Sequence, residues 1–123
     1  DSEALFLLAI AEGLERDPKG ACERAVGQLE SLSRTAGAAP HMRLTAALSD
    51  GERLYAIRYA SDAEAPTLYH RRSCSRGGRA VVSEPLEAGE EGWCAIPPGS
   101  WAEIRVEGVE ITPFHPVAEA LAA

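Results

Sequence analysis

The stretch Ala46-Ala47-Leu48-Ser49-Asp50-Gly51-Glu52-Arg53-Leu54-Tyr55-Ala56-Ile57-Arg58-Tyr59 predicts two β-strands joined by a tight turn. Asp-Gly is a strong turn signal, because glycine accepts a positive φ and aspartate hydrogen-bonds to its own backbone. We therefore expect a hairpin whose second strand is covered on both sides, as in a layered sandwich. Alternation gives that strand two mixed faces: Leu54, Ala56 and Arg58 on one, and Tyr55, Ile57 and Tyr59 on the other.

The length of the chain suits one domain with its own core. Its 123 residues are 46% hydrophobic and 25% charged, so we expect residues 1–123 to form a single unit. The net charge of −7 argues against a nucleic-acid partner. The basic cluster at 70–79 is interpreted as a solvated, mobile loop.

The sequence predicts neither an export signal nor a membrane-spanning segment. The longest apolar run, at residues 4–11, is far short of the roughly 20 residues that cross a bilayer. The three cysteines form no CxxC pair, which is typical of free thiols in a reducing compartment. We therefore expect a cytoplasmic protein with no membrane partner.

Two helices are predicted at the start of the chain. Residues 2–15 form an apolar helix that needs cover on more than one side, broken by Gly13 to Pro18. A second helix, Pro18 to Thr35, is amphipathic and ends at Gly37. Its predicted buried stripe is Cys22, Ala25, Val26, Leu29, Leu32 and Ser33, and its predicted polar face is Glu23, Arg24, Gln28, Glu30 and Arg34.

The remainder of the sequence has the pattern of strands. Helices followed by strands indicate an α+β fold, and the short connections predict mainly antiparallel sheets. A short helix is expected after Pro116. The predicted strands are 42–48, 53–59, 67–71, 80–86, 101–107 and 109–112.

Several residues could carry chemistry. Cys94 could pair with His41, His70 or His115 as a thiol–imidazole couple, although a small buried hydrophobe is the simpler interpretation. Zinc would need His70, Cys74 and Cys94, but only one arm of a paired ligand set is present, so no metal is expected.

Two carboxylates, those of Glu84 and Asp1, are further candidates for a functional role. Glu84, at the end of a strand, could be a general base or could form a structural ion pair. Asp1 stands just before the first helix, where aspartate is ordinarily an N-cap.

Four segments, taken in order, resemble the small single-domain branch of the class II glutamine amidotransferases. They are Asp1-Ser2-Glu3-Ala4-Leu5-Phe6-Leu7-Leu8, Leu48-Ser49-Asp50-Gly51-Glu52-Arg53-Leu54-Tyr55-Ala56, Val81-Val82-Ser83-Glu84-Pro85-Leu86, and Trp93 with Ile96-Pro97-Pro98-Gly99-Ser100. The resemblance extends to about Phe114, and each motif alone is moderately specific.

The resemblance implies part of an αββα sandwich of the N-terminal-nucleophile hydrolase type. Family enzymes hydrolyse the glutamine side-chain amide to glutamate and ammonia, using an N-terminal cysteine whose own amino group is the base. An Asn-Gly pair stabilises the oxyanion, an arginine holds the substrate carboxylate, and an aspartate holds the substrate ammonium. No cofactor is implied.

Only the aspartate maps onto this chain, as Asp1. Residue 1 is not cysteine and the chain contains no asparagine, so the sequence resembles the C-terminal half of the enzyme. We expect it to be inactive alone and to need the N-terminal half, in the same or a separate chain, to act on glutamine or another γ-glutamyl amide.

Two other functions stay open: a non-catalytic binding or scaffold domain with the same sandwich fold, and a thiol enzyme using Cys94. The roles of Glu84 and Arg58 and the ammonia acceptor stay open too, as does the oligomeric state, with a homo-oligomer among the options.

Overall fold

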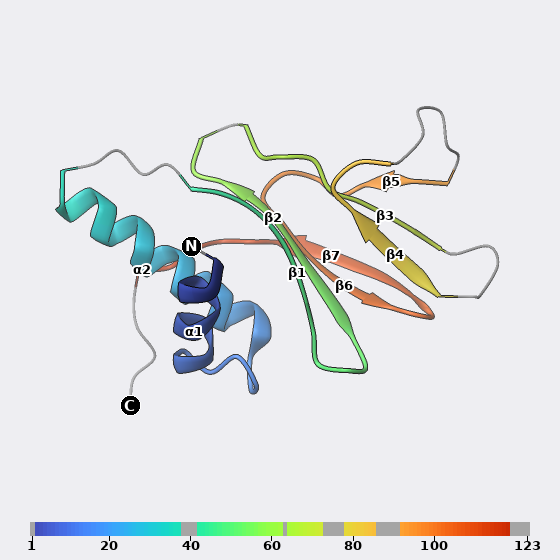
Figure 1. The fold of residues 1–123 in the computed structure, drawn as a ribbon, viewed down its shortest axis with the longest axis horizontal. Coiled ribbons are helices and arrows are strands. Elements are labelled where there is room, and N and C mark those ends of the chain that lie inside the picture. The colour runs from blue at the N-terminus through green and yellow to red at the C-terminus, as the bar shows by residue number, and fades with distance from the viewer. Residues whose placement is uncertain (1, 38–41, 63, 73–77, 86–91, 119–123) are drawn as a thin grey trace. The chain divides into compact units, whose positions relative to one another are not determined.

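The computed structural model describes residues 2–37, 42–62, 64–72, 78–85 and 92–118. It divides into two compact units, Asp1–His41 with Phe114–Ala123, and Met42–Pro113. The first contains the helices and the second the strands, as Figure 1 shows. The fold is therefore α+β, as expected. The single-unit organisation of residues 1–123 stays a prediction.

Helix α1 spans Ser2–Ala11 and is shorter than the predicted helix 2–15. Gly13, at φ 97°, ends it. The amide of Gly13 donates to Ile10 O at 3.1 Å and that of Leu14 to Ala9 O at 3.1 Å. This is the bond pattern of a glycine-terminated helix, so the chain turns two residues after α1 ends.

Helix α2 spans Pro18–Thr35, the predicted range. Asp17 is its N-cap and accepts a hydrogen bond from the Gly20 amide at 3.1 Å. The carboxylate also lies 3.8 Å from Arg24, whose guanidinium lies 3.4 Å from the Glu12 carboxylate and donates to the Glu12 carbonyl at 2.7 Å. These contacts fix the connection between the two helices. Gly37, at φ 81°, follows the helix end as predicted.

The predicted buried and polar faces of α2 are correct in the first half of the helix, but each is wrong at one later position. Cys22, Ala25 and Val26 are buried. Leu32 is 64% exposed, because it lies beyond the buried segment of the helix. Glu30, predicted on the polar face, is 8% exposed. Helical spacing of apolar residues therefore finds the buried face of α2 but not the residue at which burial ends.

The segment after Phe114 packs along α2. The His115 amide donates to the Glu23 carboxylate at 2.7 Å, and the Val117 amide donates to the Glu23 carbonyl at 3.0 Å. Gly27 makes this approach possible, because a Cβ there would overlap the Val117 carbonyl. Residues 116–118 are not helical, and the rest of the predicted tail helix, 119–123, lies outside the described residues.

The first sheet contains four strands in the order β1-β2-β6-β7, and all its pairs are antiparallel. The β1–β2 turn is the predicted one. Asp50 accepts hydrogen bonds from the Glu52 and Arg53 amides at 2.9 and 2.8 Å, and Gly51 has φ 96°. The strands are β1 Arg43–Ser49, β2 Leu54–Ala60, β6 Ser100–Arg105 and β7 Gly108–Pro113.

The second sheet has the order β4-β3-β5 and is also antiparallel. Its strands are β3 Tyr69–Arg72, β4 Arg79–Val82 and β5 Cys94–Ala95. β4 is shorter than the predicted 80–86, because residues 83–84 form a bend before Pro85. At two residues, β5 is too short to show a strand pattern in the sequence.

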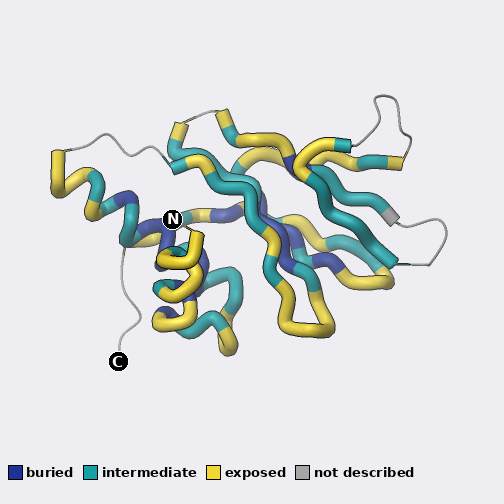
Figure 2. Tube along the Cα trace, viewed as in Figure 1, coloured by how far each residue is buried: buried dark blue, intermediate teal, exposed yellow. Residues whose placement is uncertain are grey.

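One core joins the two sheets of this unit. Ala56, Ala102 and Ile104 from the first sheet pack with Leu68 and Ile96, which flank β3 and β5. The opposite face of the first sheet is also buried at Tyr55, Ile57 and Trp101. Figure 2 shows buried segments within the strands. The expected burial of both faces of β2 is therefore confirmed, with Tyr55 and Trp101 rings 5.2 Å apart.

The αββα layering and the N-terminal-nucleophile superfamily stay predictions. Among the helices that the structure describes, none is long and apolar enough to cross a membrane.

Candidate functional site

Asp1, the predicted substrate-binding residue, lies outside the described residues. The structure begins α1 at Ser2, so Asp1 directly precedes the first helical residue. The first turn also carries Glu3. Unpaired backbone amides and the positive end of the helix dipole favour a carboxylate at this point. The role of Asp1 stays a prediction.

Arg58 is a structural residue of the sandwich. From β2, its guanidinium donates to three backbone carbonyls: Pro66 at 2.8 Å, Ile96 at 2.6 Å and Ala65 at 3.1 Å. These bonds tie the 65–66 loop and the segment after β5 to the first sheet. Because its three nitrogen atoms all donate to the backbone, we assign Arg58 to loop positioning.

Glu84 is exposed in the bend that follows β4. The preceding carbonyl, of Ser83, accepts a hydrogen bond from the Thr67 hydroxyl at 2.9 Å, which fixes the bend beside the start of β3. Whether Glu84 acts as a general base or forms a structural ion pair stays open.

Cys94 and His70 are direct cross-strand partners in the β3–β5 pair. Directly opposite residues have Cβ atoms roughly 5 Å apart, so the two side chains leave the same face of the sheet at neighbouring positions. Burial, helped by the charge of Arg79, lowers the pKa of His70, which favours the neutral ring. Cys94 is exposed, so its predicted burial is wrong. Of the other two candidate partners, His41 lies outside the described residues and His115 belongs to the helical unit, so their pairing with Cys94 stays a prediction.

Cys22, unlike the exposed Cys94, has a buried thiol. It is buried in α2, and burial, with the charges of Glu23 and Asp17, raises its pKa to about 11. A thiol with so high a pKa is almost wholly protonated near neutral pH and is a poor nucleophile.

The metal hypothesis finds no support in the described part of the chain. No three His, Cys, Asp or Glu residues gather there in a way that could hold a metal ion. Cys74, one of the three ligands considered, lies outside that part.

The basic cluster at 70–79 is not simply a loop. His70 to Arg72 belong to β3 and Arg79 begins β4, while 73–77 lie outside the described residues. Arg71 lies over the Trp93 ring, 4.5 Å from its centroid. The expectation of a solvated loop is therefore wrong for the strand residues.

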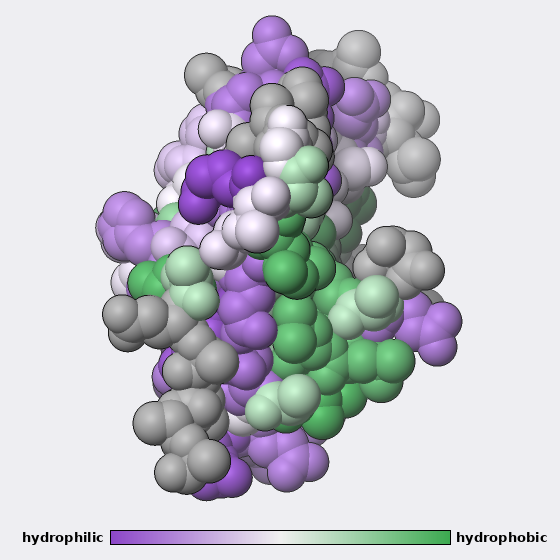
Figure 3. Space-filling view, turned by 90° about the vertical axis from the view of Figure 1, so that its left-hand side faces the viewer, coloured by the Kyte–Doolittle hydropathy of each residue, from purple (hydrophilic) through white to green (hydrophobic). Residues whose placement is uncertain are grey.

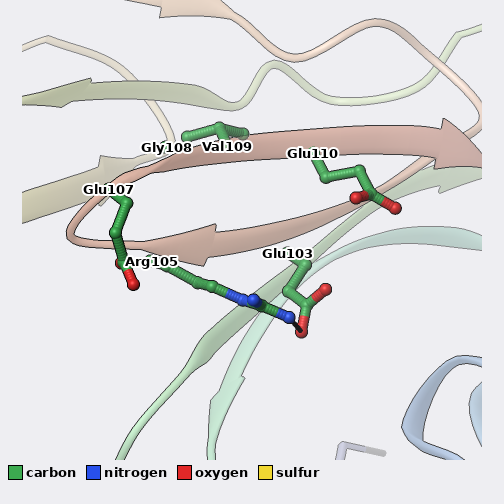
Figure 4. Close-up of a pocket in the computed structure, with 6 residues that line it drawn as sticks. All are labelled: Glu103, Arg105, Glu107, Gly108, Val109 and Glu110. Atoms are coloured by element: carbon green, nitrogen blue, oxygen red, sulfur yellow. Dashed lines mark hydrogen bonds and ion pairs between the residues drawn. The ribbon is translucent and has the colours of Figure 1, made fainter.

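The sequence did not reveal a group of charges at the tips of the two hairpins of the first sheet. The Arg105 guanidinium lies 2.9 Å from a Glu103 carboxylate oxygen. Figure 4 marks this interaction. Arg53, in the turn before β2, lies 3.4 Å from the same oxygen. The β2–β6 pairing brings these residues together, and no local sequence motif joins them.

The fold and these residues define an α+β domain with two packed antiparallel sheets, and comparison with known proteins adds a relationship. The chain is similar to a solved structure from Silicibacter pomeroyi, named glutamine aminotransferase class-II domain protein, at 56% sequence identity and a TM-score of 0.87. The match covers 95% of this chain and 52% of that one, so the chain spans about half the length of that protein. No protein-family model and no curated protein matches. The similarity supports a domain of the class II glutamine amidotransferase type.

Proposed function

We propose that this chain is the C-terminal half of a class II glutamine amidotransferase domain. The complete enzyme hydrolyses the side-chain amide of glutamine, or of a related γ-glutamyl amide, to the free acid and ammonia. The observation that carries the proposal is the 56% identity over 95% of the chain, combined with coverage of only 52% of the similar protein.

The division of labour follows from the residues that are present. Asp1 would accept charge-assisted hydrogen bonds from the substrate ammonium. The nucleophilic cysteine, the oxyanion donors and the arginine for the substrate carboxylate would come from the other half. Cys22 is unsuited to replace that cysteine, because it is buried and its pKa is about 11.

The surface of α1 supports the idea of a missing half. Phe6, Leu7 and Ile10 are 49%, 58% and 47% exposed, although the helix is apolar all round. Figure 3 looks onto the helical side and shows a hydrophobic surface there. Large exposed apolar surface is uncommon on a complete soluble domain. In this proposal the other half covers it.

The test is an Asp1→Ala variant of the longest native polypeptide that contains this chain, assayed for ammonia release from glutamine. We expect a raised KM, because the ammonium loses its partner. Asp17→Ala is the matched control, since Asp17 also precedes a helix but caps α2 instead. An unchanged KM in the Asp1 variant, with an active parent enzyme, would exclude the assigned role of Asp1.

A further inference from the structure

The strand unit has a small cleft at the tips of its hairpins. Its volume is about 190 Å³, and it lies between the β1–β2 turn, the end of β6 and the start of β4. Arginines from all three places line it: Arg53, Arg105 and Arg79. An adjoining pocket, drawn in Figure 4, shares Arg105.

The charge of this cleft contrasts with that of the chain. The whole sequence carries −7, yet the cleft lining holds three arginines and one carboxylate, Glu52. Glu103, beside the cleft, is shared by Arg53 and Arg105. The adjoining pocket adds Glu107 and Glu110, so the excess of positive charge is confined to the lining of the cleft itself.

Arg79 has unused donor capacity. Its Nε is buried and has no hydrogen-bond partner among the residues that the structure describes. One terminal nitrogen reaches the Val106 carbonyl at 3.5 Å, a distance at the long limit of a hydrogen bond. The Arg79 side chain is partly buried, and an Nε–H without a partner is costly, so an acceptor oxygen there would be stabilising.

We propose that this cleft is a binding site for a small oxyanion, a carboxylate or a phosphate group, held by Arg79 with Arg53 and Arg105. The guanidinium group matches the planar or tetrahedral oxygens of these anions with paired N–H donors. The size of the cleft suits a small anion better than a large ligand, because sites for drug-sized ligands are roughly 300–1,000 Å³. This inference is independent of the proposed amidotransferase activity.

The experiment is a titration of the longest native polypeptide containing this chain with inorganic phosphate and, separately, with succinate at constant ionic strength. NMR of the arginine side-chain N–H groups and of the Gly51 and Val106 amides reports binding. We expect saturable shifts at these groups, and the tighter of the two anions identifies the oxyanion class. An absence of saturable shifts with both anions would overturn the proposal.

Variants with opposite expected effects sharpen the test. Arg79→Gln should weaken binding about tenfold, as for the loss of a charge-assisted hydrogen bond. Glu103→Gln should tighten binding, because it frees Arg53 and Arg105 from their shared partner. Arg43→Gln is the matched control, since Arg43 is an exposed arginine that pairs with Asp62 and Glu64.

If Arg79→Gln proves unfolded by circular dichroism, Arg105→Gln takes its place with the same expected loss. Equal weakening by the Arg43 control would contradict a specific site. So would a Glu103→Gln variant that binds less tightly than the parent protein.

Discussion

The two helices of this protein differ in a way that their compositions do not foretell. α1 is apolar on every side, yet of its ten residues, all of which the structure describes, one is buried, Ala9. α2 carries charges along its length and buries six residues, Glu30 among them. Hydrophobic residues alone therefore do not decide which helix is covered within this chain.

The difference shows which of the two helices is covered by another segment of this chain. α2 packs against the segment after Phe114, which approaches closely at Gly27 and bonds to Glu23. α1 keeps Phe6, Leu7 and Ile10 about half exposed. In the proposed function, α2 is complete within the chain and α1 needs the other half.

The largest expected effect comes from placing the same charge on each helix. Val26→Asp in α2 buries an unpaired carboxylate at a site with 0% exposure and should cost more than about 3 kcal/mol, or prevent folding. Leu7→Asp in α1 should change the stability of this chain by less than about 0.5 kcal/mol, because exposed sites tolerate substitution. Urea denaturation measures both.

The same Leu7→Asp change should become costly in the longest native polypeptide, where the proposal covers α1. If Leu7→Asp lowers the free energy of unfolding equally in the short and the long polypeptide, the proposal that the other half covers α1 is contradicted.

A smaller effect is expected where the C-terminal segment meets α2. Gly27→Val places side-chain atoms where the Val117 carbonyl lies and should destabilise the chain by about 1–3 kcal/mol. Gly108→Ala is the control, because a Cβ there meets nothing within 4 Å. A tolerated Gly27→Val, measured by thermal unfolding, would show that the segment does not contribute to the packing of α2.

The starts of the two helices give a further, weaker comparison. Asp17→Ala removes the cap bond to the Gly20 amide and should cost about 1 kcal/mol. Glu3→Gln removes a first-turn charge from α1 and should cost a few tenths of a kcal/mol, about the size of an exposed dipole interaction. Urea midpoints of the two variants, measured together, test the order of the two costs.

The smallest effect at neutral pH concerns Cys22. Its pKa is raised from 9.0 to about 11 in the folded protein, so the folded state holds the proton while the unfolded state releases it. Stability contributed by the protonated thiol is therefore complete below pH 9 and falls as the pH rises toward 11. Cys22→Ala should flatten this part of the stability curve, measured by urea midpoints from pH 8 to 11. An unchanged slope of stability against pH in the Cys22→Ala variant would show that another group causes the loss of stability at high pH.

Local features were the ones that the sequence predicted well. Three predicted features depend on residues that are close together in the sequence, and the structure contains all three. They are the Asp50–Gly51 turn, the helix α2 and the antiparallel hairpins. The end of α1 was placed four residues too late, because the helix ends at Ala11, just before Gly13 adopts a positive φ, and does not continue to residue 15.

Features formed by distant residues were not predictable in the same way. Arg58 donates to carbonyls at positions 65, 66 and 96, and Glu103 pairs with Arg53 across the β2–β6 contact. No sequence spacing links such residues. Asp1 was chosen through the family resemblance, and its role stays a prediction.

The most direct test of the central claim is ammonia release from glutamine, measured for this chain alone and for the longest native polypeptide that contains it. The proposal predicts activity only in the longer polypeptide, because no residue of this chain matches the family nucleophile. Ammonia release by the 123-residue chain alone would contradict the account and would direct attention to Cys94, which stands opposite His70.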